Sequence, residues 1–282
     1  MEIKRVGICG SGIMGAGMAE VVARAGFEVV VRSRSQATAD AAMAGVTKSL
    51  ARQVDKGRLG LEEANATIGR MSGAADIGAL ESCDLVIESV VEDLETKRQL
   101  FADLDRTCGP STILATNTST LPVVEMATAT GRPEKVLGLH FFNPAPVMSL
   151  VEVVTTLLTA PDVTEAAVDF ATACGKTPVT VNDRAGFIVN ALLFPYLNNA
   201  VRMLENGTAS KDDIDAAMKG GCGFPMGPLA LLDLVGLDTS MAILDALHTE
   251  FADPNYAPMP LLRRMVSAGR LGRKTGSGFF DY

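Results

Sequence analysis

The sequence has no tryptophan, three tyrosines and only two histidines among its 282 residues. It also lacks a basic run, and its formal net charge is −8. Non-specific binding to nucleic acid depends on lysine and arginine side chains that neutralise phosphates, so this class of function is not expected. The longest uncharged run, residues 185–201, contains a proline, a tyrosine and three asparagines. This composition predicts a buried helix rather than a membrane span, and we expect no membrane partner.

Cysteine is scarce, and its spacing argues against two further kinds of site. The five cysteines are odd in number and form no C-x-x-C pair, which favours neither a disulfide framework nor a metal site. The first residues enter a glycine-punctuated apolar stretch that lacks the core of a signal peptide. We expect a cytoplasmic protein that holds no metal. Its reduced thiols would be Cys9, Cys83, Cys108, Cys174 and Cys222.

A glycine turn near the N-terminus carries the most informative short motif. Residues 5–9 predict a strand, residues 16–25 a helix and residues 29–31 a buried strand, and together these predict a βαβ unit. In the turn, the first glycine permits a tight bend, the second lets the backbone approach a pyrophosphate, and the third lets helix and strand pack closely. The helix N-terminus then faces the phosphates. We expect a dinucleotide here, and the alternative is a turn without a ligand. The turn residues are Gly10, Ser11, Gly12, Ile13, Met14 and Gly15.

The end of the second strand departs from the usual NAD-binding pattern. An acid normally stands there and holds the ribose 2′-hydroxyl, but this sequence has Ser33 between Arg32 and Arg34. A carboxylate would repel a 2′-phosphate, whereas an arginine can pair with it. We therefore predict a preference for NADP(H) over NAD(H). The alternative is that the arginines are only solvated and that Ser33 binds the hydroxyl itself.

Further strand patterns predict a crevice at one edge of a doubly wound sheet. Residues 84–90, 112–116 and 137–142 are apolar runs, and ligands bind beyond the carboxyl ends of such strands. Glu92, Ser119 and His140 all fall at such ends, and we expect them around one crevice. Ser119 has a structural alternative, because it can also cap a following helix.

His140 is the candidate general base. It lies near the end of an apolar strand, and a second strand predicted over residues 147–155 carries Glu152. The Pro-rich turn between the two strands can bring the two side chains together. A carboxylate beside an imidazole fixes its tautomer and stabilises its protonated form, as a base that takes a proton from a hydroxyl requires. The alternative is a core histidine whose nitrogen bonds a backbone carbonyl.

The remaining patterns are mainly helical. Residues 37–56 and 61–69 predict two helices, and Ser49 and Lys56 lie two turns apart on nearly the same face of the first. The spacing alone is also compatible with two surface residues that bind no ligand. After residue 184 the pattern is entirely helical, and these helices are apolar enough to bury surface against each other and against a second subunit. On the first of them, Asn190 shares a face with Phe194 and either reaches the cleft or satisfies a core backbone group. The predicted helices are 187–205, 211–219, 228–247 and 261–268.

Over its whole length the sequence resembles the L-3-hydroxyacyl-CoA dehydrogenases, and most closely the short bacterial 3-hydroxybutyryl-CoA dehydrogenases. The resemblance implies a Rossmann-type, mostly parallel doubly wound sheet over residues 1–184, with a helical CoA-binding arm near 37–69. An all-helical domain for substrate binding and dimerisation would follow over residues 185–282. The motifs are GSGIMGAGMA (10–19), SVVED (89–93), NTST (117–120), GLHFFNPAPVMSLVEVV (138–154), GFIVNALLFPYLNNA (186–200), MGPLALLDLVGLDT (226–239) and GRKTGSGFF (272–280).

The resemblance also implies catalytic roles. His140 matches the general base of the family and Glu152 its partner, whereas Ser119 and Asn190 match residues that contact the hydroxyl or keto oxygen of the substrate. The implied reaction is reversible hydride transfer between (S)-3-hydroxyacyl-CoA and 3-oxoacyl-CoA, with NAD or NADP as cofactor. In oxidation His140 removes the proton of the 3-hydroxyl, and in reduction it returns a proton.

Ligand contacts and partners follow from the same match. Ser49 and Lys56 match coenzyme A contacts on the arm, and the implied assembly is a homodimer through the helical domain. Two departures stand out: the family usually has Asp at position 33, which leaves NAD against NADP open, and Ser at position 120. Two alternatives remain, a sugar-acid dehydrogenase on the same scaffold and a non-catalytic dinucleotide-binding protein. The matching cofactor contacts outside the glycine turn are Ser119, Glu92, Lys97, Asn143 and Lys274.

Overall fold

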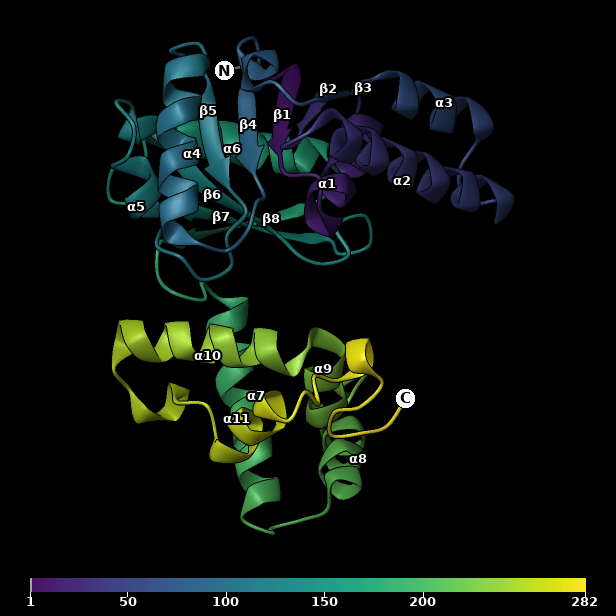
Figure 1. Ribbon diagram of the computed structural model, residues 1–282, viewed down its shortest axis with the longest axis vertical. Helices are drawn as coiled ribbons and strands as arrows, with labels where there is room; N and C mark the ends of the chain where they lie inside the picture. The colour runs from purple at the N-terminus through teal and green to yellow at the C-terminus, as the bar shows by residue number, and fades with distance from the viewer. Residues whose placement is uncertain (1) are drawn as a thin grey trace. The chain divides into compact units, whose positions relative to one another are not determined.

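Eight strands form one sheet in the first part of the chain, in the order β3-β2-β1-β4-β5-β6-β7-β8 (Figure 1). The structure is a computed structural model that describes residues 2–282, and the chain divides into two units, Met1–Asp183 and Arg184–Tyr282. β1 to β6 are parallel, β7 runs antiparallel to β6, and β8 is parallel to β7. From β1 the chain first runs outward to β2 and β3, and it then continues on the other side of β1 from β4 to β8, as in doubly wound sheets. The strands are β1 (Arg5–Cys9), β2 (Glu28–Arg32), β3 (Met71–Ala74), β4 (Leu85–Glu88), β5 (Ile113–Thr116), β6 (Val136–Phe141), β7 (Leu150–Thr155) and β8 (Thr177–Asn182).

Helices cover both faces of this sheet. α1 (Ile13–Arg24) and α6 (Pro161–Ala173) bury their apolar sides in one core cluster with the sheet. α4 (Leu94–Thr107) and α5 (Val123–Ala127) pack on each other, and α5 contacts β6 from the opposite face (Figure 1). Apolar residues of the strands therefore meet a helix on either side, which is why the parallel strands are continuous hydrophobic runs.

The pleat of β6 decides which face carries the candidate base. Leu137 and Leu139 belong to the core cluster under α1 and α6. A Cβ added to Gly138 would meet Val123 of α5 at 3.3 Å, on the other face. Side chains alternate along a strand, so His140 projects from the same face as Gly138, toward the side of α5.

The two helices after β2 pair with each other. α2 (Gln36–Asp55) and α3 (Leu61–Gly69) bury a small cluster between them that includes Leu50 and Leu59. In Figure 1 the two helices extend side by side away from the sheet. The chain returns from this arm through β3, an edge strand that the sequence analysis did not predict.

Five helices of the second unit surround a separate apolar core, to which Phe194 and Leu197 contribute. The prediction of one continuous helix over residues 228–247 is wrong. Gly236 has a φ of 101°, which no right-handed helix accommodates, so α9 ends before it and α10 begins after it. Among residues 2–282, no helix combines the length and the apolarity that crossing a bilayer requires. The helices are α7 (Val189–Glu205), α8 (Lys211–Cys222), α9 (Pro228–Val235), α10 (Leu237–Phe251) and α11 (Pro260–Ser267).

Asp233 of α9 holds the last residues of the chain. Its side chain is 1% exposed, and it accepts hydrogen bonds from the backbone N–H of Phe279 and of Phe280, each at 2.8 Å. The Tyr282 hydroxyl donates to the same carboxylate at 3.1 Å. Burying a carboxylate is costly unless its oxygens are bonded, so these donors belong to the structure of the second unit.

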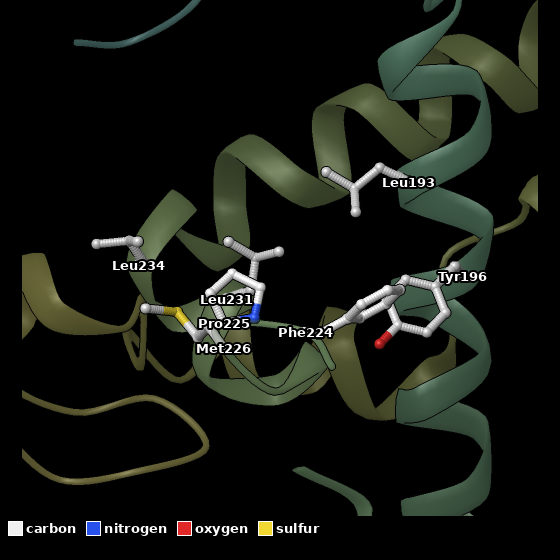
Figure 2. Close-up of a pocket in the computed structure, with 7 residues that line it drawn as sticks. All are labelled: Leu193, Tyr196, Phe224, Pro225, Met226, Leu231 and Leu234. Atoms are coloured by element: carbon white, nitrogen blue, oxygen red, sulfur yellow. The ribbon is translucent and has the colours of Figure 1, made fainter. Parts of the chain in front are cut away.

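An apolar pocket of about 300 Å³ opens on the second unit (Figure 2). It lies between α7, α9 and the segment that joins α8 to α9. Phe224 and Leu234 are 42% and 49% exposed, so much of the lining faces solvent. The lining residues are Leu193, Tyr196, Phe224, Pro225, Met226, Leu231 and Leu234.

Candidate active site

His140 and Glu152 lie opposite each other in the antiparallel ladder of β6 and β7. The distance from His140 Nδ1 to Glu152 Oε2 is 2.7 Å, and both residues are buried, with 4% and 0% of their surface exposed. Because a carboxylate can only accept, we assign the proton to Nδ1, which leaves the lone pair of the neutral ring on Nε2. β7 begins at Leu150 and not at residue 147 as predicted. Residues 147–149 belong to the Pro-rich turn, where Val147 N donates to the Pro144 carbonyl oxygen.

Ser119 meets the other side of the imidazole. The distance from Ser119 Oγ to His140 Nε2 is 3.0 Å. Ser119 lies in the segment that follows β5, and Asn117 in the same segment accepts a hydrogen bond from the backbone N–H of Phe141 at 2.8 Å. This contact joins the segment to the end of β6. The structure thus brings together three residues that the sequence predicts for catalysis, namely Ser119, His140 and Glu152.

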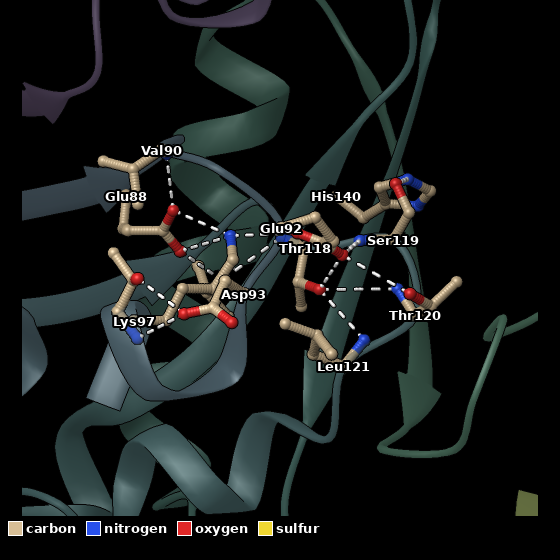
Figure 3. Close-up of polar contacts among 12 residues, drawn as sticks. Glu88, Val90, Glu92, Asp93, Lys97, Thr118, Ser119, Thr120, Leu121 and His140 are labelled. Carbon is tan, nitrogen blue, oxygen red and sulfur yellow. Dashed lines mark hydrogen bonds and ion pairs between the residues drawn. The ribbon is translucent and has the colours of Figure 1, made fainter. Parts of the chain in front are cut away.

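Glu92 fixes the Ser119 segment from the side of β4 (Figure 3). Its Oε1 accepts from the backbone N–H of Ser119 at 3.0 Å and from the hydroxyl of Thr118, and its Oε2 lies 3.1 Å from Lys97 Nζ. Burial acts to raise the pKa of Glu92, but the Lys97 ammonium and these donors outweigh it and lower the pKa below its usual value. Glu92 is therefore a charged anchor at neutral pH.

The glycine turn has the shape that a dinucleotide needs. A Cβ on Gly10 would lie 2.1 Å from Ser89 O and one on Gly15 2.0 Å from Gly10 O, so only glycine fits at both positions. A Cβ on Gly12 would meet no atom within 4 Å. Gly12 is the N-cap of α1, and no side chain caps the start of this helix. The residues present fit a bound pyrophosphate.

Ser33 joins the glycine turn to the end of β2. Its hydroxyl lies 2.7 Å from Ser11 Oγ and 2.6 Å from Thr38 Oγ1, and the residue is only 6% exposed. Arg34 is exposed, and Arg32 donates through Nε to the Ala75 carbonyl oxygen at 3.2 Å. A hydroxyl cluster with a neighbouring guanidinium therefore stands where an NAD-binding fold usually has an acid.

Three of the remaining predicted site residues lie elsewhere in the first unit. Asn143 is exposed in the turn between β6 and β7, Ser49 is half-buried on α2, and Lys56 is exposed at the C-terminal end of that helix. The second unit contains the other two. Asn190 is buried near the start of α7, and Lys274 Nζ donates to Asp238 Oδ2 at 2.7 Å. The roles of these residues stay predictions.

Sequence reasoning missed Glu88, the last residue of β4. It is fully buried and accepts from Lys97 Nζ at 2.8 and 2.9 Å and from the Thr116 hydroxyl at 2.7 Å. The signal was present, since an acid inside an apolar strand has to find a partner. In the part of the chain that the structure describes, no three histidine, cysteine or acidic side chains gather as a metal site would require.

A doubly wound sheet with this glycine turn, and with a buried imidazole–carboxylate pair at the carboxyl edge of the strands, defines a dinucleotide-dependent oxidoreductase. Comparison with known proteins identifies the family. Residues 5–184 match the model "3-hydroxyacyl-CoA dehydrogenase, NAD binding domain", and residues 186–282 match "3-hydroxyacyl-CoA dehydrogenase, C-terminal domain". The chain belongs to the 3-hydroxyacyl-CoA dehydrogenase family, whose members catalyse the reversible NAD-dependent oxidation of 3-hydroxyacyl-CoA to 3-oxoacyl-CoA.

Full-length relatives agree with this assignment. The chain is 49% identical over 282 residues to a 3-hydroxybutyryl-CoA dehydrogenase of Mycobacterium tuberculosis, with 99% of each chain covered. It is 44% identical over 282 residues to a probable 3-hydroxybutyryl-CoA dehydrogenase of Bacillus subtilis, covering 100% of this chain and 98% of the relative. The crystal structure of (S)-3-hydroxybutyryl-CoA dehydrogenase from Ralstonia eutropha matches with a TM-score of 0.97 and 41% identity, over 100% of this chain and 99% of that chain. The predicted family, fold class and dehydrogenase activity are confirmed.

Proposed function

We propose that this enzyme interconverts (S)-3-hydroxybutyryl-CoA and acetoacetyl-CoA, with His140 as the general acid and base. The observation that carries the proposal is the placement of His140 between Glu152 at 2.7 Å and Ser119 at 3.0 Å. The bound nicotinamide would accept the hydride from the substrate carbon in oxidation and supply it in reduction. All remaining steps are proton transfers and hydrogen bonds made by the protein.

His140 Nε2 takes the proton of the 3-hydroxyl in the oxidation direction. The imidazolium that forms is stabilised by Glu152, because the carboxylate already bonds Nδ1 and needs no rearrangement. In reduction the protonated ring returns the proton to the developing alkoxide. The Ser119 hydroxyl, held beside Nε2, would hydrogen bond the same oxygen, and a well-placed donor of this kind contributes about 3 kcal/mol at the transition state.

For the cofactor we propose NADP(H) in preference to NAD(H). The structure has no acid at position 33, and the Ser33 hydroxyl lies within hydrogen-bond distance of Ser11 and Thr38. These uncharged hydroxyl groups do not repel a 2′-phosphate, and the exposed guanidinium of Arg34 can pair with it. This pairing distinguishes the two cofactors, because an NAD ribose offers no charge to Arg34.

For the acyl-CoA we propose that the α2–α3 arm provides part of the site. Lys56 is exposed at the end of α2 and is available to a phosphate, and Ser49 lies on the same helix. The family resemblance supports both contacts. Two copies of the chain would assemble through the exposed apolar side chains of the second unit, which include Leu192, 72% exposed, and Phe224 beside the pocket (Figure 2).

We further propose that the enzyme works in the cytoplasm. All five cysteines are free, and burial raises the pKa of Cys108 to about 11 and of Cys174 to about 12. Burial thus keeps these thiols protonated at neutral pH, while five cysteines without a disulfide are typical of a reducing compartment.

The decisive experiment is spectrophotometric turnover of acetoacetyl-CoA with NADPH and NADH in parallel. Faster reduction of acetoacetyl-CoA than of longer 3-oxoacyl-CoA thioesters supports the substrate, and a higher kcat/KM with NADPH supports the cofactor. Gulonate is the control substrate, since a dehydrogenase acting on sugar acids would oxidise it. Oxidation of gulonate without reduction of acetoacetyl-CoA would overturn the proposal.

A further inference from the structure

Lys97 is the most deeply buried cation of the first unit and lies next to the catalytic segment. Its side chain is 1% exposed in the first turns of α4, a helix that Asp93 starts by accepting from Thr96 N at 2.9 Å. Lys97 Nζ lies 2.8 Å from Glu88 Oε1, 2.9 Å from Glu88 Oε2 and 3.1 Å from Glu92 Oε2 (Figure 3). An ammonium has three N–H donors, and these three acceptors engage them within the protein.

The Glu88–Lys97 pair is built to hold a geometry. Glu88 also accepts from Val90 N at 2.6 Å and from the Thr116 hydroxyl at 2.7 Å, so its partners come from α4, from β5 and from the segment directly after β4. A buried ion pair adds little net stability over a well-packed apolar pair, whereas it strongly prefers one arrangement of its partners. The contribution of this pair is therefore to fix the positions of neighbouring residues.

A continuous chain of contacts leads from Lys97 to the imidazole. Glu92 binds Lys97 through Oε2 and accepts from the backbone N–H of Ser119 through Oε1. The hydroxyl of the same Ser119 lies 3.0 Å from His140 Nε2. The hydroxyl of Thr118, which also donates to Glu92, accepts from Leu121 N at 3.0 Å. Movement of Glu92 would therefore shift the segment that sets the position of Ser119.

We propose that Lys97 and Glu88 are positioning residues of the dehydrogenase: they fix Glu92, and Glu92 fixes Ser119 against His140. We call Lys97, Glu88 and Glu92 the clamp; the inference rests on the proposed function, since the clamp would act on the proposed proton-transfer site. It gives Lys97 a role other than the direct cofactor contact that the family resemblance implies. A direct contact acts without Ser119, whereas a positioning role acts only through it.

The test removes both charges together, because Lys97→Met alone would leave the buried Glu88 carboxylate without a counter-charge. The variant is Glu88→Gln with Lys97→Met, which retains the side-chain volumes. We expect retained cooperative unfolding, a Kd for NADPH within about threefold of wild type, and kcat reduced about 10- to 100-fold, the scale of a small misplacement of a reacting group. In a Ser119→Ala background the same double change should lower kcat by less than about twofold.

The matched control is another ion pair of the same helix. Asp105 of α4 accepts from Arg132 Nε at 2.6 Å. This pair is not part of the series of contacts from Lys97 through Glu92 and Ser119 to His140. Asp105→Asn with Arg132→Met also removes two opposite charges, from a less buried pair, and should leave kcat unchanged. Equal losses of kcat in both double variants would overturn the proposal, as would reductions that multiply in the Ser119→Ala background.

A measurement without turnover separates this proposal from the function itself. The chain has only two histidines, so His248→Gln identifies the ring nitrogens of His140 in ¹⁵N NMR spectra. If the clamp acts through Ser119, the Nε2 signal in the Glu88/Lys97 variant should shift toward its position in Ser119→Ala. An unshifted signal would overturn the clamp even in an active enzyme, and a shifted signal would support it whatever substrate the enzyme prefers.

Discussion

Glu152 and His140 are directly opposed residues of one antiparallel ladder, so their 2.7 Å contact is set by strand register. Most catalytic contacts in α/β enzymes come from loops on a rigid scaffold. Here the proposed base and its partner both belong to strands of the sheet, and Ser119 comes from a connecting segment. The acid–base pair should therefore be preorganised before any ligand binds.

The first prediction concerns this pair. His140→Gln should lower kcat about 10²- to 10⁴-fold, because it removes the general acid and base, while the Kd for the dinucleotide changes little. His248→Gln is the control, since it removes the other histidine, in α10. Glu152→Gln should lower the rate and alter the pH–rate profile, because the amide no longer stabilises an imidazolium. Near-normal turnover in His140→Gln would remove this residue from the proposed role.

The second prediction separates folding from binding in the glycine turn. Gly10→Ala places a Cβ 2.1 Å from Ser89 O at a φ of 126°, and should destabilise the protein by well over 1 kcal/mol. Gly12→Ala meets no protein atom and has an extended backbone, so its Tm should stay close to wild type while its Kd for the dinucleotide rises. Thermal unfolding and fluorescence titration measure the two effects. Equal losses of Tm in both variants would contradict this division.

The third prediction tests the cofactor. Arg34→Gln should reduce kcat/KM with NADPH about 10- to 100-fold, the range for loss of a charged hydrogen bond, and should leave kcat/KM with NADH nearly unchanged. Ser33→Asp should reverse the preference by repelling the 2′-phosphate. Arg58→Gln, another exposed arginine of the first unit, is the control. A wild-type enzyme that prefers NADH would contradict the assignment.

The fourth prediction follows from the charge state of Glu92. Because the pKa of Glu92 lies below its ordinary value of 4.5, its ionised form stabilises the fold above that pH, and this contribution is lost as the pH falls through the lowered pKa. The Tm difference between wild type and Glu92→Gln should thus be constant above about pH 6 and shrink below about pH 4.5. A Tm difference that widens as the pH falls would mean that protonated Glu92, and not its ionised form, stabilises the fold.

The fifth prediction addresses assembly. Phe224→Glu or Leu192→Asp should convert a dimer into a monomer in analytical ultracentrifugation, because each places a charge on the exposed apolar surface of the second unit. Leu157→Asp is the matched control, a fully exposed leucine of the first unit. A wild-type monomer, or a dimer that persists in both variants, would overturn the proposed interface.

The sequence was sufficient for the fold class because buried parallel strands are apolar runs with a fixed order of helices between them. It also placed Ser119 and His140 at one edge, since the carboxyl ends of parallel strands converge. The edge strand β3 was missed because Met71–Ala74 is short and contains small residues without alternation. The pairing of Glu88 with Lys97 was missed for a different reason. The distance between them depends on the path from β4 to α4, which no pattern of residue types specifies.

The hydrogen bonds that Phe279, Phe280 and Tyr282 donate to Asp233 have a practical consequence. A chain cut before residue 279 would leave a carboxylate in the interior without its donors, and the second unit would lose stability rather than a dispensable tail. Engineering that needs a removable end, such as a fused reporter or an immobilisation handle, should leave these residues intact and place any addition beyond a spacer.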